Sequence, residues 1–209
     1  MPRLGEVVRL EGPARFRRIL SSWPRPSRSL QGRSLTVTIP APSVHHLRPV
    51  TPVDDGFLFT LYASTRAREL ASWGWGAAQQ EVFLRTQYQA QSRHYAAIYS
   101  PEGHALIEVD GVPVGRQWLV RTEAETLLVD LALLPSHQGQ GLGTRLLCAI
   151  QEEAARARVA VRLNVTRDNP ALRLYTRHGF TPVPGNSPAS PYLELWWKAP
   201  DDGAGTDVR

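Results

Sequence analysis

The chain has 209 residues, of which 42% are hydrophobic, and this is enough for one domain with a sizeable core. Its formal net charge of +5 is unevenly placed, because residues 1–40 carry eight arginines against two glutamates, whereas residues 41–209 carry 16 basic and 17 acidic side chains. The composition therefore predicts neither a basic nucleic-acid-binding domain nor, since no stretch reaches the ~18–20 apolar residues of a span, a membrane protein.

The N-terminal segment, residues 1–44, is rich in arginine, proline and serine, most clearly in the run Ser-Ser-Trp-Pro-Arg-Pro-Ser-Arg-Ser at residues 21–29. Such a composition predicts an extension that does not pack. Three interpretations stay open: a disordered tail, a start-site artefact, and an arm that contacts a membrane or a nucleic acid. Residues 200–209 are expected to form a flexible tail, so the folded domain is expected to span residues 45–199.

The first part of the domain is predicted to hold one strand and two helices. Apolar periodicity places the strand at residues 46–50 and the helices at 53–73 and 77–99. The residues expected on the inner face of the first helix are Leu58, Leu61, Tyr62 and Leu70. Those expected on the apolar stripe of the second helix are Val82, Phe83, Tyr88, Tyr95 and Ile98.

The second part of the domain is predicted to begin with a hairpin of strands at 105–110 and 112–122, joined by a turn at Asp110-Gly111. The remaining elements, in chain order, are a strand at 126–134, a helix at 142–158, a strand at 160–166, a helix at 170–178, and strands at 181–184 and 191–198. Three antiparallel strands followed by a β-α-β crossover predict an α/β fold class, with a central mixed sheet and helices on both faces.

The most informative segment is the glycine-rich turn Gln138-Gly139-Gln140-Gly141-Leu142-Gly143, which lies between an apolar strand and a helix. Glycines let the backbone approach a ligand closely, and the free amides at the start of a helix favour phosphate or pyrophosphate. A P-loop is excluded because Lys198 is the only lysine, and the glycine spacing departs from that of a dinucleotide loop. A glycine-rich turn without a ligand is the remaining alternative.

Two motifs, in order along the chain, resemble the signatures of the GNAT superfamily of acyl-CoA-dependent N-acyltransferases. Gln138 to Gly143 satisfies the pattern Gln/Arg-x-x-Gly-x-Gly/Ala, and Asn169 to Phe180 satisfies Asn-x-x-x-x-x-Tyr-x-x-x-Gly-Phe. The predicted order of elements over residues 46–198 is similar to that of the GNAT fold. This resemblance implies that acetyl-CoA is the co-substrate.

The resemblance also implies how acetyl-CoA binds. The strands before and after the helix at 142–158 would begin paired and then splay apart, with the pantetheine arm in the opening. Backbone groups of Leu131 and Leu133 would bond the acyl carbonyl and the pantetheine amides. Asn169 would cap the following helix and contact the arm, and Arg145 would either help with phosphate charge or lie on a solvated helix face. The pyrophosphate would bind the backbone amides of Gln138, Gly139, Gln140, Gly141, Leu142, Gly143 and Thr144.

Two catalytic roles are expected when an amine attacks a thioester, a proton donor to the thiolate and a proton acceptor from the amine. Tyr175 matches the position of the general acid in this superfamily, and a tyrosine that only packs is the alternative. The candidate base is Asp130, which strand alternation points to the face opposite Leu131, with Glu125 and Glu123 at the start of the same strand. An aspartate paired with an arginine is the alternative for Asp130.

The sequence thus predicts an N-acetyltransferase that acts on a primary amine of a small molecule or peptide, with a non-catalytic acyl-CoA sensor as the alternative. Cytoplasmic location, no membrane or nucleic-acid partner for the domain, and a monomer or homodimer are expected. A nucleic-acid contact would come from the N-terminal segment alone. Cys148, the single cysteine, is expected to pack, and the six histidines lack metal-ligand spacing, so no metal is expected. The regions that supply the acceptor side in this superfamily offer Trp73, Trp75, Gln87, Arg93, His94, Tyr95 and Trp118, and a place in the core is the alternative for each aromatic residue.

Overall fold

The computed structural model describes residues 45–200. The predictions for the N-terminal extension and for the tail from residue 201 onward lie outside the described residues. None of the helices within residues 45–200 combines the length and the apolar composition needed to cross a membrane.

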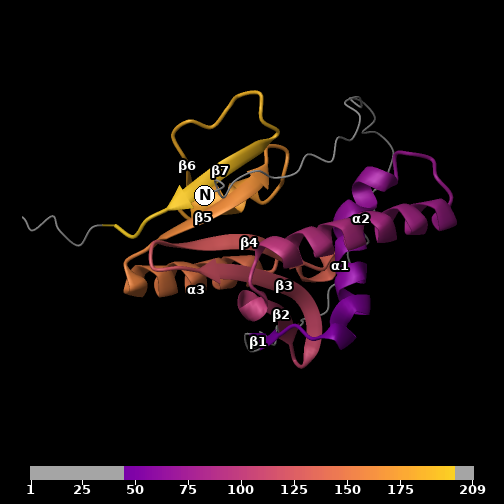
Figure 1. The fold of residues 1–209 in the computed structure, drawn as a ribbon, viewed down its shortest axis with the longest axis horizontal. Helices are drawn as coiled ribbons and strands as arrows, with labels where there is room; N and C mark the ends of the chain where they lie inside the picture. Colours follow the sequence, from indigo (N-terminus) through magenta and orange to yellow (C-terminus); the bar gives the residue numbers. More distant parts are fainter. Residues whose placement is uncertain (1–44, 201–209) are drawn as a thin grey trace, which may run out of the picture. The chain divides into compact units, whose positions relative to one another are not determined.

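The described residues form a mixed sheet, as the order of predicted elements indicated (Figure 1). Its strands lie in the order β1-β2-β3-β4-β5-β7-β6, and within it β4 and β5 run parallel while the other neighbours run antiparallel. The strands are β1 (His45–Pro49), β2 (His104–Val109), β3 (Val112–Arg121), β4 (Glu125–Leu133), β5 (Ala160–Thr166), β6 (Thr181–Pro182) and β7 (Tyr192–Trp197).

Helices cover both faces of this sheet, as predicted. They are α1 (Asp55–Leu70), α2 (Ala77–Ile98), α3 (Leu142–Ala157) and α4 (Leu172–Arg177), with short 3-10 turns at Pro52–Asp54, Pro101–Gly103 and Pro135–His137. Leu106 packs with α1 and α2, whereas the next residue, Ile107, packs with α3. Because successive strand residues point to opposite faces, α1 and α2 lie on one face and α3 on the other (Figure 1).

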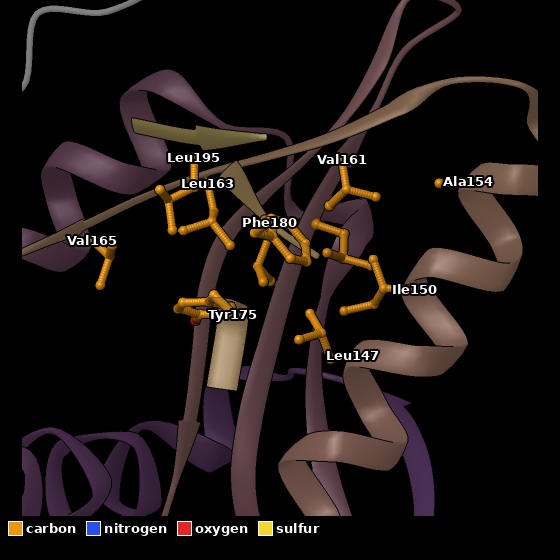
Figure 2. Close-up of a cluster of buried hydrophobic side chains, with 11 residues drawn as sticks. Leu147, Ile150, Ala154, Val161, Leu163, Val165, Tyr175, Phe180 and Leu195 are labelled. Atoms are coloured by element: carbon orange, nitrogen blue, oxygen red, sulfur yellow. The ribbon is translucent and has the colours of Figure 1, made fainter. Parts of the chain in front are cut away.

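The largest cluster of buried side chains joins α3 and α4 to the strands that flank the crossover. Leu147 and Ile150 from α3 meet Val161 and Leu163 from β5, and each of these four side chains is at most 3% exposed (Figure 2). Tyr175 of α4 also lies in this cluster. The packing of these apolar α3 side chains against the sheet therefore sets where α3 begins relative to the ends of β4 and β5.

The apolar stripe predicted for α2 is partly wrong. Val82 and Ile98 are 68% and 45% exposed, whereas Leu84 and Tyr88 are buried. The inward-facing side chains recur with helical spacing from Leu84 through Tyr88 and Gln91. Apolar residues occur on two sides of this helix, so periodicity alone did not select the side that packs against α1 and the sheet.

Candidate functional site

The parallel strands β4 and β5 are paired over only part of their length. Pairing runs from Glu125 with Ala160 to Leu128 with Leu163 and stops there. β4 nevertheless continues to Leu133, and β5 continues to Thr166 alongside β7. The sheet therefore opens between the second halves of these two strands, which is the arrangement implied by the GNAT resemblance.

A β-bulge in β4 lies at the point where the strands part. Trp118 of β3 is paired with Asp130, but the next residue, Leu119, is paired with Leu128, so Val129 is an extra residue in β4. A bulge bends its strand and reverses the alternation of the residues beyond it. No sequence pattern indicates this bulge, since residues 126–134 read as one continuous strand.

The bulge turns the backbone groups of two predicted binding residues into the opening. Before the bulge, the Glu125 carbonyl faces β3 and accepts a 2.9 Å hydrogen bond from the amide of Thr122, the residue that follows β3. Beyond it, the Leu134 amide donates a 2.8 Å hydrogen bond to β3, so the groups of even-numbered residues now face β3. Those of Leu131 and Leu133 consequently face the opening. The Leu133 carbonyl accepts a 2.7 Å hydrogen bond from the Gln138 side chain, which joins the strand to the glycine turn.

The glycine turn leads directly from this strand into α3. Gly139 and Gly141 have φ angles of 72° and 78°, in the left-handed region where a side chain is strained. Gly141 is the N-cap of α3 and has no side-chain cap, so the first amides of this 16-residue helix have no intrahelical partner. A Cβ atom on Gly143 would lie 3.4 Å from Leu174 of α4, so this glycine permits close packing. Arg145 is exposed, and its Nη1 lies 3.5 Å from where a Gly141 Cβ would be.

Tyr175 lies in α4 and is 7% exposed. Its ring packs against Phe180, with 5.7 Å between the ring centroids, inside the cluster shown in Figure 2. Within residues 45–200 its hydroxyl has no hydrogen-bond partner. Burial, with a further contribution from the Asp130 carboxylate, raises the pKa of Tyr175 to about 12. The phenol is therefore protonated across the neutral and alkaline range and stands near Asp130.

Asn169 and Gly179 bound the α4 segment as the second motif predicted. The Asn169 side chain accepts a 2.8 Å hydrogen bond from the amide of Ala171, so it caps the turn that leads into the helix. Gly179 has a φ of 78° just after the helix, and the Phe180 amide returns to the Tyr175 carbonyl at 3.1 Å. The regular helix is shorter than the predicted 170–178, because the first of those residues form a turn.

Asp130 lies on the α1 and α2 face of the sheet, opposite Leu131, as alternation predicted. Its carboxylate accepts a hydrogen bond from Nε of Arg116, which is 8% exposed and lies on β3. The arginine partner that the sequence left open therefore exists. Glu125 instead pairs with Arg162 at 3.0 Å, at the closed end of β4 and β5, and Glu123 is exposed in the preceding turn. Of the three acidic candidates, only Asp130 stands beside the opening.

Comparison with known proteins agrees with this geometry. Residues 100–182 match the family model described as an acetyltransferase (GNAT) domain. Residues 100–182 therefore resemble a GNAT acetyltransferase domain, and the chain is similar in fold to solved GNAT structures. Its fold is similar to that of the PaiA N-acetyltransferase from Thermoplasma acidophilum, solved with coenzyme A, at 16% identity and a TM-score of 0.54, covering 74% of this chain and 99% of that one.

A second GNAT structure has the same fold. It is the GCN5-related N-acetyltransferase from Rhodopseudomonas palustris, with 18% identity and a TM-score of 0.51. The match covers 75% of this chain and 96% of that one. No curated protein sequence matches the chain significantly.

The aromatic residues considered for the acceptor side lie in different parts of the domain. Trp118 is 5% exposed, and its indole donates a 3.0 Å hydrogen bond to the Ser100 carbonyl, so it is a core residue. Trp73 and Trp75 pack edge to face, with 4.8 Å between their centroids, at the connection from α1 to α2. Tyr95 is half-buried, and burial together with the charge of Asp130 raises its pKa to about 12. The other predicted acceptor residues, which all lie on α2, are Gln87, Arg93 and His94.

Cys148 of α3 is half-buried, and its Sγ atom lies 3.8 Å from Nδ1 of His178. In the described part of the chain, no group of three or more histidine, cysteine, aspartate or glutamate side chains is arranged to hold a metal ion. The expectation of a metal-free reaction stays a prediction.

His104 of β2 is a half-buried histidine next to the site, and it makes stability depend on pH. Its ring stacks on Trp118, with 4.0 Å between centroids, and its Nε2 is buried without a hydrogen-bond partner among the described residues. Burial, and secondarily the charge of Arg116, lowers its pKa to about 4. Because the unfolded chain takes up this proton near pH 6.5 and the folded chain does so only near pH 4, stability is lost as pH falls through that interval.

We therefore expect the free energy of unfolding to fall by about 2 kcal/mol between about pH 7 and pH 4.5 through His104 alone. Urea unfolding of the wild type and of His104→Phe at both pH values measures this contribution. The variant keeps a ring on Trp118 but has no proton to bind, so its loss should be smaller. Equal losses in the two proteins would contradict the assignment.

Proposed function

We propose that the protein is an N-acetyltransferase that transfers the acetyl group of acetyl-CoA to a primary amine within a ternary complex. The observation that carries the proposal is the opening between β4 and β5, because it ends at the glycine turn and the start of α3. One continuous surface thus offers strand-edge backbone groups for an amide-containing arm and free helix amides for a pyrophosphate.

The residues present fit the acyl-CoA group. Leu131 and Leu133 direct backbone groups into the opening, and Gly139 and Gly141 have no side chains to obstruct an approach to the turn. Arg145 stands over the same turn and would add positive charge beside the phosphates. When bound, acetyl-CoA supplies the thioester that is attacked.

Two side chains would move the protons of the reaction. Asp130 would accept a proton from the incoming ammonium, directly or through water, so that the neutral amine attacks the acyl carbon. A C–N bond then forms, the C–S bond breaks, and the nitrogen loses its second proton to water. The Tyr175 phenol would donate its proton to the departing thiolate and recover one from water, and its raised pKa keeps that proton available at assay pH. A backbone N–H in the opening would stabilise the negative charge that develops on the acyl oxygen.

The direct test is an assay of free thiol released from acetyl-CoA across a panel of amines, including small primary amines, amino acids and peptides. Amine-dependent release together with acetylated product would support the proposal. Measurable binding of acetyl-CoA without release for any amine would contradict it and favour a sensor of acyl-CoA. The same panel would identify the acceptor class.

A further inference from the structure

Arg116 is a buried charged residue that the acetyl-transfer scheme does not use. It lies on β3, and its side chain is 9% exposed. A buried guanidinium loses much of its hydration, and a single ion pair seldom repays that cost in stability. Stability therefore does not explain why this position holds an arginine.

The guanidinium of Arg116 connects β4 to α2. Its Nε donates to Oδ2 of Asp130, and its Nη2 donates to Oε1 of Gln91 at 3.4 Å. Gln91 belongs to the inward-facing side of α2. The Asp130 carboxylate of β4 is therefore held by Arg116, and Arg116 is in turn held by Gln91 of α2, the helix that covers this face.

The two oxygens of Asp130 have different environments. Oδ2 is committed to Arg116, whereas Oδ1 has no hydrogen-bond partner among residues 45–200. The Asp130 side chain is 26% exposed, so the carboxylate is accessible on one side and fixed on the other. Its charge also contributes to the raised pKa values of Tyr175, on α4, and Tyr95, on α2.

We propose that Arg116 is a positioning residue. It fixes the rotamer of Asp130 through Oδ2 so that Oδ1 is presented to the acceptor ammonium, and Gln91 holds Arg116 in place. This inference rests on the proposed acetyl transfer and adds to it the residues that orient the proton acceptor. It predicts that Arg116 acts only through Asp130, because it contacts no other group with a role in the reaction.

The test is a double-mutant cycle of Arg116→Gln and Asp130→Asn with an amine that the panel identifies. Arg116→Gln should lower kcat by about tenfold to 100-fold, as expected when a catalytic group is misplaced by ~1 Å, while KM for acetyl-CoA changes by less than about twofold. In the Asp130→Asn background, Arg116→Gln should have no further effect on kcat. Arg116→Lys should recover part of the activity, because it restores a positive donor to Oδ2.

Arg48→Gln is the matched control. Arg48 lies on β1, which β2 and β3 separate from β4, and pairs at 2.7 Å with the buried Asp54. This variant should lose stability without changing kcat. Multiplicative effects of Arg116→Gln and Asp130→Asn, or equal losses of kcat in Arg48→Gln and Arg116→Gln, would overturn the inference and leave the proposed function intact.

If no amine is acetylated, the proposed function is contradicted, but the role of Arg116 can still be tested. The measurement is the exchange of its Nε–H proton with water, observed by NMR. In the free protein, the Nε–H signal of Arg116 should exchange slowly with water because the carboxylate accepts it. Asp130→Asn should accelerate that exchange, and Arg48→Gln should not. An Nε–H signal that is unchanged in Asp130→Asn would overturn the inference independently of turnover.

Discussion

Replacing Tyr175 by phenylalanine is expected to lower kcat for acetyl transfer about 100-fold or more, while the affinity for acetyl-CoA stays nearly unchanged. The change removes only the hydroxyl, and within residues 45–200 this hydroxyl has no hydrogen-bond partner to lose. The ring keeps its contact with Phe180 and its place in the α3 and α4 cluster. Loss of turnover would therefore report the missing proton donor and not a disturbed fold.

The pH dependence adds a second expectation for Tyr175. Because its pKa is raised to about 12, the phenol does not titrate in the usual assay range. The kcat of the wild type should not decline between about pH 8 and pH 10 through loss of this proton. Steady-state kinetics over that interval, together with acetyl-CoA binding by calorimetry, measure both expectations.

Tyr88→Phe is the matched control for this experiment. Tyr88 is 6% exposed, its pKa is also raised to about 12, and its hydroxyl donates to Asp55 at 2.6 Å near the start of α1. Its removal should reduce stability and leave kcat within about twofold of the wild type. Unchanged turnover in Tyr175→Phe would exclude Tyr175 as the acid. Equal losses of turnover in the two variants would show that the effect is structural.

Replacing Gly103 by alanine is expected to lower the free energy of unfolding by about 3 kcal/mol or more. A Cβ atom at this position would lie 1.7 Å from the carbonyl oxygen of Leu119 and 2.8 Å from its carbonyl carbon. These are backbone atoms of β3, so no side-chain rotation can relieve the contact. The turn of Pro101–Gly103 would have to move away from the strand that carries Trp118 and Arg116.

Gly56→Ala provides the control for the glycine substitution. Gly56 lies in α1, and nothing lies within 4 Å of where its Cβ would be. Alanine there should leave stability unchanged or raise it by up to about 1 kcal/mol, through helix propensity. Denaturant unfolding of the three proteins makes the comparison. A Gly103→Ala variant as stable as the wild type would contradict the packing described for the Pro101–Gly103 turn.

Much of the fold follows from local patterns that the sequence displays directly. β5 occupies the predicted residues 160–166, and the Asp110-Gly111 turn has the positive φ angles, 52° and 76°, of a tight hairpin. The four residues assigned to the inner face of α1 are buried. These elements were predictable because each of them buries one face, and the spacing of apolar residues along the element indicates which face is buried.

The details that shape the site depend on contacts between distant segments. The bulge at Val129 arises from the register between β3 and β4, and no single residue of β4 predicts it. Arg116 is one arginine among many, and only the register places it beside Asp130. On the acceptor side, Trp118 takes the core position that was left open as the alternative for each aromatic residue.

The central claim is that acyl-CoA binds in the opening between β4 and β5. A crystal structure of the protein with coenzyme A tests it most directly. We predict hydrogen bonds from the pantetheine amides to the backbone of Leu131 and Leu133, and the pyrophosphate on the amides from Gln138 to Thr144. Coenzyme A bound elsewhere, or β4 and β5 closed together in the complex, would contradict the account.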